Sequence, residues 1–533
     1  MKSVAGRVMA ICLVVLALFV PAGCGGGAGG SGRDLAELVP ADALAYAEFT
    51  IDTDSEPADR LFEIIGRFSD EDLRAELESA IDENTDGLSF DDLDAAFCDR
   101  AAAYAGDFAI ADQLIPSAAV FAEVADQGKA EELIELIGSK LPEAQETEVD
   151  GITYMSAGPL AYGIVDDLFI LGTTAGLTEV AQNADGAEGE RLADRAEFTQ
   201  TERIGREDTL AYGYFDFAAL FDLAERAIDS GLADGLSGEG LSPGGSTRQL
   251  WSDLLDYYKQ GFGLSEIDAR PAAFAIDARD DRISFVALTG SNEDRPELSS
   301  PTLSASVPED AWLAVSADDY FKGFEEELRS PILTQSLSFS KERIERVYRK
   351  GLGIDLAALG ALEDLMIAAR GTTVDELSVR AVLGAPKPQG LRAALNGFAK
   401  SAILQRLGDV TPLDLPDPAI GYSIESAALP KPLLVGLGKT RLVITYGDDG
   451  FEDLLSADGG PTTTGPLADA GPLFGEGGVA SGAIDLDAVV ALVADAGDAT
   501  DEDLAKAEPV DLIAVGGRDE GDVRISQFIF TVD

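Results

Sequence analysis

The chain has 533 residues, of which 97 are Asp or Glu and 39 are Lys or Arg, so its formal net charge is −58. Apolar residues make up 46% of the sequence, which is typical of a folded protein and argues against disorder. The sequence has no histidine and three cysteines, which excludes Ser-His-Asp and Cys-His catalysis, histidine zinc sites and four-cysteine metal clusters. Because the acidic residues are spread along the chain and basic residues are few, we expect no nucleic-acid partner and no cofactor.

The first residues have the pattern of an export signal. Lys2 and Arg7 precede an apolar run at residues 8–20. This run is shorter than the ~20 residues that a membrane-spanning helix needs. The small residues Pro-Ala-Gly then precede Cys24, and this stretch resembles the lipobox of bacterial lipoproteins. The resemblance implies a signal peptide at residues 1–23, cleavage before Cys24 and diacylglycerol on its sulfur. The alternative is ordinary secretion, with cleavage in the same stretch and a free Cys24.

Residues 24–36 are predicted to form a tether between this anchor and a folded body. Glycine dominates residues 25–32, and such a composition behaves as a flexible coil. We therefore expect the body at the extracytoplasmic face of the cell membrane, with the membrane as its partner through Cys24. After lipidation Cys98 is the free thiol of the mature chain, and its position beside Phe97 predicts a buried, small apolar role.

Hydrophobic periodicity predicts short strands mixed with helices. In chain order these are a strand at 43–51, a helix at 61–68, strands at 104–111 and 118–124, a helix at 129–140, strands at 152–156, 161–165 and 168–172, a helix starting at 177, a strand at 210–215, a helix at 217–228 and strands at 273–278 and 283–288. Hairpins dominate, for example at the turn Asp166-Asp167. We therefore predict an α+β fold in which a mostly antiparallel sheet carries helices on one face.

Short sequences of the first half return in the second half, in the same order and at nearly constant spacing. The pairs are VPADA at 39–43 with VPEDA at 307–311, 159–163 with 432–436, 168–171 with 442–445, and Asp216-Phe217 with Asp485-Leu486. The sequence RIS at 282–284 returns at 524–526 with a shorter spacing, so we expect that the second copy has lost a segment. We predict two tandem duplicated lobes at residues 37–290 and 306–533, joined by a linker at 291–305.

The stretch from Asp82 to Asp86 matches the opening of an EF-hand calcium loop. The twelfth position of such a loop should be a bidentate Glu, and here it is Leu93. The repeat places Arg346 and Lys350 opposite two of the would-be ligands. A turn between helices explains this better, and the sequence leaves open whether the loop binds a cation.

Three short motifs suggest catalysis or nucleotide binding. Ser338 and Lys341 fit S-x-x-K, a serine-nucleophile signature that needs no histidine, but its companion S-D-N is missing. Residues 240–244 fit G-x-S-x-G in a Gly/Ser-rich loop, and residues 438–440 resemble the end of a P-loop but precede a predicted strand. We predict a helix cap at Ser338 and no catalytic, cofactor-binding or metal-binding residue. A hydrolase that uses carboxylates, or Ser338 with Lys341, is one alternative.

The export signal, VPADALAY at residues 39–46 and its echo at 307–311 together resemble a family of uncharacterised exported proteins of actinobacteria and cyanobacteria. This family is catalogued as domain of unknown function 3352, and the resemblance covers nearly all of the mature chain. The resemblance implies export and brings no catalytic residues. We predict a non-enzymatic, membrane-anchored lipoprotein that binds or scaffolds components of the cell envelope. A carrier of a lipid or another apolar ligand, held in a groove of the lobes, is the second interpretation.

Overall fold

The computed structural model describes two compact units. The described residues are 33–51, 55–67, 95–108, 116–141, 143–205, 209–229, 272–279, 281–290, 297–321, 356–401, 404–427, 429–447, 450–457, 464–497, 500, 504 and 509–532. Of these, the first unit holds residues 33–229, 272–290 and Glu520–Ile525, and the second unit holds 297–519 and 526–532.

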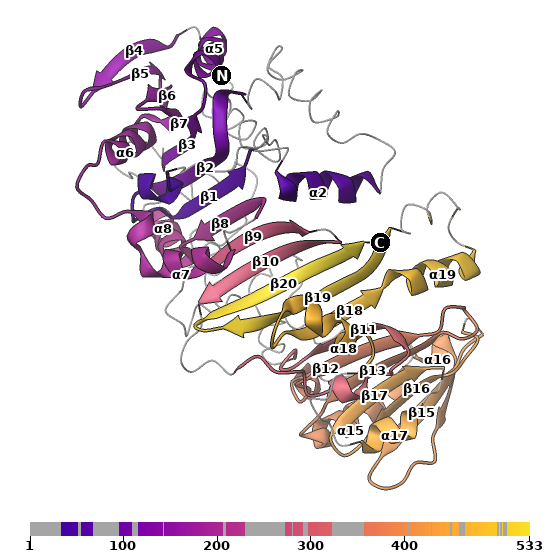
Figure 1. Ribbon diagram of the computed structural model, residues 1–533. Helices are drawn as coiled ribbons and strands as arrows, with labels where there is room; N and C mark the ends of the chain where they lie inside the picture. The colour runs from indigo at the N-terminus through magenta and orange to yellow at the C-terminus, as the bar shows by residue number, and fades with distance from the viewer. Residues whose placement is uncertain are drawn as a thin grey trace. The chain divides into compact units, whose positions relative to one another are not determined.

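The first unit is built on one antiparallel sheet (Figure 1). Its strands are β1 (Ala45–Thr50), β2 (Phe97–Phe108), β3 (Pro116–Val124), β4 (Gln145–Val149), β5 (Ile152–Ala157), β6 (Leu160–Val165), β7 (Leu168–Thr173), β8 (Ala211–Phe215), β9 (Ala272–Arg279) and β10 (Arg282–Gly290). They pair in the order β4-β5-β6-β7-β3-β2-β1-β8-β9-β10, and each neighbouring pair is antiparallel. Asp166 and Asp167 join β6 to β7 with φ of 47° and 63°, as a type I′ hairpin turn requires. The predicted α+β class is confirmed.

Helices cover both faces of this sheet, so the expectation of helices on one face is wrong. The helical elements are η1 (Leu35–Leu38), α2 (Glu56–Gly66), α5 (Gln127–Lys140), α6 (Thr174–Ala184), η2 (Leu192–Asp194), α7 (Ala196–Gly205) and α8 (Phe217–Asp229). Leu168 and Ile170 of β7 lie in a core with η1, α6 and α7, whereas Phe169 and Leu171 lie in a second core with α5. Because all four side chains are buried, neither face of β7 is left to water.

Local sequence signals explain where these helices begin. α5 follows Asp126, whose side chain accepts a hydrogen bond of 3.1 Å from the Lys129 amide. α6 follows Thr173, whose hydroxyl accepts one of 3.1 Å from the Gly176 amide. A Cβ at Gly176 would collide with the carbonyl of Ala118, so glycine allows α6 to pack directly on β3.

The second unit is also built on an antiparallel sheet. Its strands are β11 (Ala311–Ala317), β12 (Leu365–Arg370), β13 (Ser378–Gly384), β14 (Asp409–Pro412), β15 (Ile420–Glu425), β16 (Leu433–Leu437), β17 (Arg441–Tyr446), β18 (Val479–Asp485), β19 (Val510–Glu520) and β20 (Val523–Val532). The first residues of β20, at 523–525, and the last residue of β19, Glu520, belong to the first unit. They pair in the order β14-β15-β16-β17-β13-β12-β11-β18-β19-β20.

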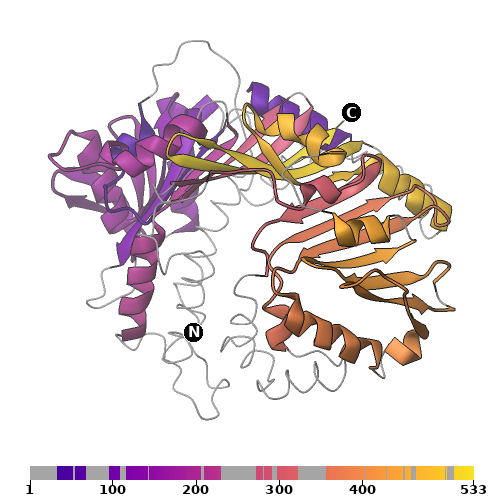
Figure 2. The same cartoon turned by 90° about the horizontal axis from the view of Figure 1, so that it is seen from below.

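Helices cover both faces here as well (Figure 2). They are η3 (Ser304–Ser306), α14 (Leu356–Leu359), α15 (Pro388–Ala399), α16 (Leu404–Leu407), α17 (Phe451–Ser456), α18 (Pro466–Ala470), η5 (Gly471–Phe474) and α19 (Leu486–Ala496). Leu434 of β16 packs in the core that contains α17, and its neighbour Val435 packs in the core that contains α15. Successive strand residues point to opposite faces, so α15 and α17 lie on opposite sides of the sheet.

The strand order of the second sheet repeats that of the first, with β1 to β10 corresponding in turn to β11 to β20. The repeated sequences fall on matching elements: residues 168–171 lie on β7 and residues 442–445 on β17. Asp216 follows β8 and accepts a hydrogen bond of 2.9 Å from the Ala219 amide. Asp485 ends β18 and accepts one of 3.1 Å from the Ala488 amide. The same aspartate cap therefore starts α8 and α19.

Candidate functional site

Most of the sequence-predicted site residues lie outside the described residues. These are the lipidation site Cys24, the loop from Asp82 to Asp86, the G-x-S-x-G stretch at 240–244, and Ser338 with Lys341. Within the described ranges, no group of three or more acidic or cysteine side chains is placed to hold a metal ion. In the same part of the chain, no helix is both long and apolar enough to cross a membrane.

Residues 438–440, which resemble the end of a P-loop, are the turn of a β-hairpin, and the predicted strand follows them. The turn joins β16 to β17, and the Gly438 amide donates a hydrogen bond of 2.8 Å to the Arg441 carbonyl. The Thr440 carbonyl accepts a hydrogen bond of 2.7 Å from the Ala385 amide. No helix begins here, so the turn has no N-terminal amides to hold a phosphate.

Cys98 lies on β2 and is half-buried, which is more open than predicted. Burial raises the pKa of its thiol above the ordinary 9.0, and the negative charges of Glu123 and Asp99 raise this pKa further. A raised pKa keeps the sulfur protonated at neutral pH, and the thiol is a poor nucleophile. The raised pKa therefore disfavours the reactive thiolate at Cys98.

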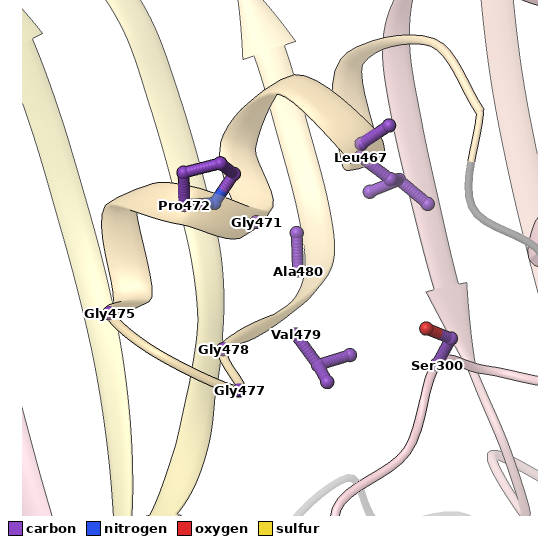
Figure 3. Close-up of a pocket in the computed structure, with 10 residues that line it drawn as sticks. Ser300, Leu467, Gly471, Pro472, Gly475, Gly477, Gly478, Val479 and Ala480 are labelled. Carbon is purple, nitrogen blue, oxygen red and sulfur yellow. The ribbon is translucent and has the colours of Figure 1, made fainter.

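A small pocket lies in the second unit (Figure 3). Its volume is about 280 Å³, and it lies between α18, η5 and the start of β18. Small and apolar residues line it: Ser300, Leu467, Ala468, Gly471, Pro472, Gly475, Gly477, Gly478, Val479 and Ala480. Gly475 and Gly477 adopt φ of 88° and 74°, which lets the chain turn tightly at its edge.

The pocket offers little chemistry. Ser300 supplies one hydroxyl, and the lining contains no carboxylate, amine or guanidinium that could act as an acid or a base. Its volume falls just below the ~300 Å³ at which small-molecule sites usually begin. The pocket does not meet the size expected of a deep lipid cavity.

A more distinctive feature is a line of apolar residues that crosses the first sheet from strand to strand, which we call the apolar row. In the first unit it consists of Ala47, Gly213, Phe274 and Ala287, which are direct partners across β1, β8, β9 and β10. The Phe274 side chain is 39% exposed. Its ring lies over Gly213, where a Cβ would collide with it, and stacks on Phe215 at a centroid distance of 5.5 Å.

The apolar row lies on the face of the sheet that carries α5 and α2 at its two ends. Ile276 and Ala278, which follow Phe274 on the same side of β9, pack against Ala58, Leu61 and Phe62 of α2. At the other end α5 covers Phe169 and Leu171 of β7. Beside these helices the row retains the exposed side chain of Phe274.

The second unit has an apolar row at the matching place. It consists of Val315 on β11, Gly482 on β18 and Val515 on β19, which are direct partners. Val315 is 38% exposed and Val515 is 42% exposed. The glycine stands on the corresponding strand in both rows, and in each unit the next residue over is a large apolar side chain of the following strand. Corresponding cross-strand partners are therefore apolar in both units, and some of their side chains are about two-fifths exposed.

The other face of β1 is the buried one, although it carries the more polar residues. Tyr46 and Glu48 are each 1% exposed, while Ala47 and Phe49 are half-buried. The Tyr46 hydroxyl donates a hydrogen bond of 2.5 Å to the Glu48 carboxylate, and Arg100 forms an ion pair of 2.5 Å with the same carboxylate. These contacts satisfy the buried charge, as burial requires. Local sequence gives no signal of the apolar row, because β1 buries its more polar residues and leaves its apolar residues half-exposed.

Comparisons with known proteins show only distant likeness. No protein-family model matches the chain, and no curated protein matches it. Among solved structures, crystal form I of TP0453 is 12% identical, with 50% of this chain and 82% of that chain covered at a TM-score of 0.25. Crystal form III is 11% identical, with 50% and 84% covered at 0.25, and form IV is 12% identical, with 50% and 83% covered at 0.24.

Proposed function

We propose that this protein is a non-enzymatic, exported lipoprotein, anchored by Cys24 to the extracytoplasmic face of the cell membrane, that binds an apolar component of the cell envelope. The observation that carries the binding role is the apolar row, which recurs at the same place in both units. Phe274, Val315 and Val515 are each about two-fifths exposed on regular strands. Contiguous exposed apolar side chains mark interaction sites more often than scattered ones do.

The two lobes at residues 37–290 and 306–533 were predicted to be tandem duplicates. A duplication would explain why each unit carries an apolar row at the same place. The shared strand order and the shared aspartate caps at Asp216 and Asp485 support a duplication. If one unit was copied with its apolar row, each copy inherits the surface.

The chemistry of the apolar row supports binding rather than catalysis. Ala, Gly, Val and Phe side chains have no group that transfers a proton or attacks a substrate. They remove hydrocarbon surface from water, which stabilises a complex by ~25 cal/mol per Å² of apolar area buried. The hydrolase alternative uses carboxylates, or Ser338 with Lys341. Ser338 and Lys341 lie outside the described residues.

The anchor is tested by mass spectrometry of the N-terminal peptide from the membrane fraction. We expect a chain that begins at Cys24 and carries diacylglycerol, and we expect a Cys24→Ser chain to appear in the medium. An unmodified Cys24 in membrane-bound protein would contradict the anchor.

The binding role is tested separately, by native mass spectrometry of the membrane-purified protein. We expect co-purified apolar molecules that are lost from a Phe274→Asp/Val515→Asp chain and retained by a Leu429→Asp chain. Leu429 is 42% exposed and lies outside the strands. Leu429→Asp therefore introduces the same charge at a similarly exposed position away from the apolar rows. Equal retention by all three chains would refute the role of the apolar row.

A further inference from the structure

We propose that the apolar rows bind the acyl chains of uncharged or zwitterionic membrane lipids. This inference rests on the proposed function and specifies its ligand. Three observations lead to it: the composition of the rows and their flanks, the length of chain between the anchor and the first unit, and the net charge of the protein.

The flanks of the first apolar row are as apolar as the row itself. On one side of the first row lie Ala45 and Phe215, which are direct partners across β1 and β8. On the other side lie Phe49 and Ala211, again direct partners, with Ile276 beyond them on β9. Burying a charged or polar group against this surface would remove its hydrogen bonds to water without replacing them. The surface therefore fits a hydrocarbon chain rather than a sugar, a peptide backbone or a headgroup.

One flank of the second row carries larger apolar side chains. Leu313, Ile484 and Ile513 are direct partners beside the row of Val315, Gly482 and Val515. Branched aliphatic side chains replace the aromatic rings of the first row and its flanks, and both surfaces are apolar. Two surfaces that share polarity but differ in shape fit a flexible apolar ligand better than a rigid one.

The tether keeps the first unit close to lipid. The described chain starts at Arg33, whose amide donates a hydrogen bond of 3.2 Å to Glu123 at the end of β3. The nine residues from Cys24 to Arg33 span at most ~30 Å when fully extended. The tether is therefore longer than the ~10 Å thickness of one packed layer of the fold. The anchored unit can then turn either face of its sheet toward the bilayer. Membrane lipids are thus the apolar molecules that stay within reach of the first row.

The net charge of −58 limits which molecules can bind at the apolar rows. A second copy of the chain would bring the same charge to the interface, and an anionic lipid surface would also repel the body. At physiological salt this repulsion acts within ~8 Å, which includes the separation of docked surfaces. Uncharged and zwitterionic lipids escape the penalty.

The test uses the secreted Cys24→Ser chain, which has no anchor of its own, in flotation with phosphatidylcholine vesicles. We expect the chain to float with these vesicles and to float less when phosphatidylglycerol is mixed in. Phe274→Asp and Val515→Asp should each lower vesicle partitioning at least tenfold, while Leu429→Asp should leave it unchanged. The urea midpoint of each variant shows whether it is folded. If Phe274→Asp is unfolded, Val515→Asp still tests the proposal.

The outcomes separate this inference from the proposed function. If the Cys24→Ser chain does not float, or if the row variants float like the parent, acyl-chain binding is refuted while the anchor measured at Cys24 still stands. If native mass spectrometry shows a dimer of the lipid-free chain that Phe274→Asp disrupts, a second copy is the occupant and the inference is overturned.

Discussion

The ring of Phe274 lies across the backbone of Gly213 on the neighbouring strand, at a point where any Cβ on residue 213 would strike it. The matching glycine of the second unit, Gly482, has ordinary space, with the Val515 Cβ 3.6 Å from where its own Cβ would lie. The two glycines thus occupy the same position in the fold under different steric conditions. This difference gives a matched pair for experiment.

We expect Gly213→Ala to destabilise the protein by about 1 kcal/mol, because the half-exposed Phe274 ring must leave its stack on Phe215. Gly482→Ala should be neutral or stabilise by about 0.5 kcal/mol, since the methyl group fits and alanine restricts the unfolded chain. In a Phe274→Ala background the Gly213→Ala penalty should vanish. Urea unfolding of the parent, the two glycine variants, Phe274→Ala and Phe274→Ala/Gly213→Ala measures these changes. Equal effects at the two glycines would show that the ring does not lie over residue 213.

The caps of α8 and α19 form a second matched pair. Asp485→Ala removes one cap hydrogen bond and should destabilise by about 1 kcal/mol. Asp216→Ala removes the equivalent bond and also the ion pair of 2.9 Å with Arg195, so the loss should be larger, at about 2 kcal/mol. Asn at either position should retain most of the cap. If Asp216→Ala costs no more than Asp485→Ala in urea unfolding, the Arg195 contact contributes nothing measurable.

The buried carboxylate of Glu48 predicts an asymmetry between single and double substitutions. Arg100→Ala leaves the carboxylate buried without this ion pair and should destabilise by about 2 kcal/mol, less than a fully buried pair because Arg100 is one-third exposed. Glu48→Gln/Arg100→Leu should recover most of this loss, since a neutral amide still accepts from Tyr46 and no charge stays buried. Thermal and urea unfolding provide the comparison. A double variant as unstable as Arg100→Ala would mean that the charge is not the cause.

The raised pKa of Cys98 predicts slow alkylation. At pH 8 a smaller fraction of this thiol is ionised than of an ordinary cysteine, because burial and the charges of Glu123 and Asp99 disfavour the thiolate. Iodoacetamide should therefore react more slowly with the folded Cys24→Ser chain than with the same chain in urea. The difference should shrink as the pH rises through the folded pKa, where the native thiol also ionises. A rate equal to that of the unfolded chain at pH 8 would contradict the assignment.

The sequence alone determined the local features of this protein. The type I′ turn at Asp166 and Asp167, the aspartate caps before α5 and α19, and the apolar alternation of the strands all follow from residues close together in the chain. The repeated landmarks also predicted which segments correspond, since residues 168–171 lie on β7 and residues 442–445 lie on β17. These signals supported an α+β fold with an antiparallel sheet, which the structure has.

The tertiary structure decided which face of each strand is buried and where helices lie. β1 buries Tyr46 and Glu48 because Arg100, a residue distant in sequence, neutralises the carboxylate, and this leaves the apolar residues of the same strand half-exposed. Helices cover both faces because β7 is apolar on both faces. Its sequence alone does not say whether helices or another sheet cover such a strand. The apolar row exists only when β1, β8 and β9 are paired in register, since its members come from strands far apart in the chain. Long-range pairing depends on the packing of the whole sheet, and local periodicity carries no information about it.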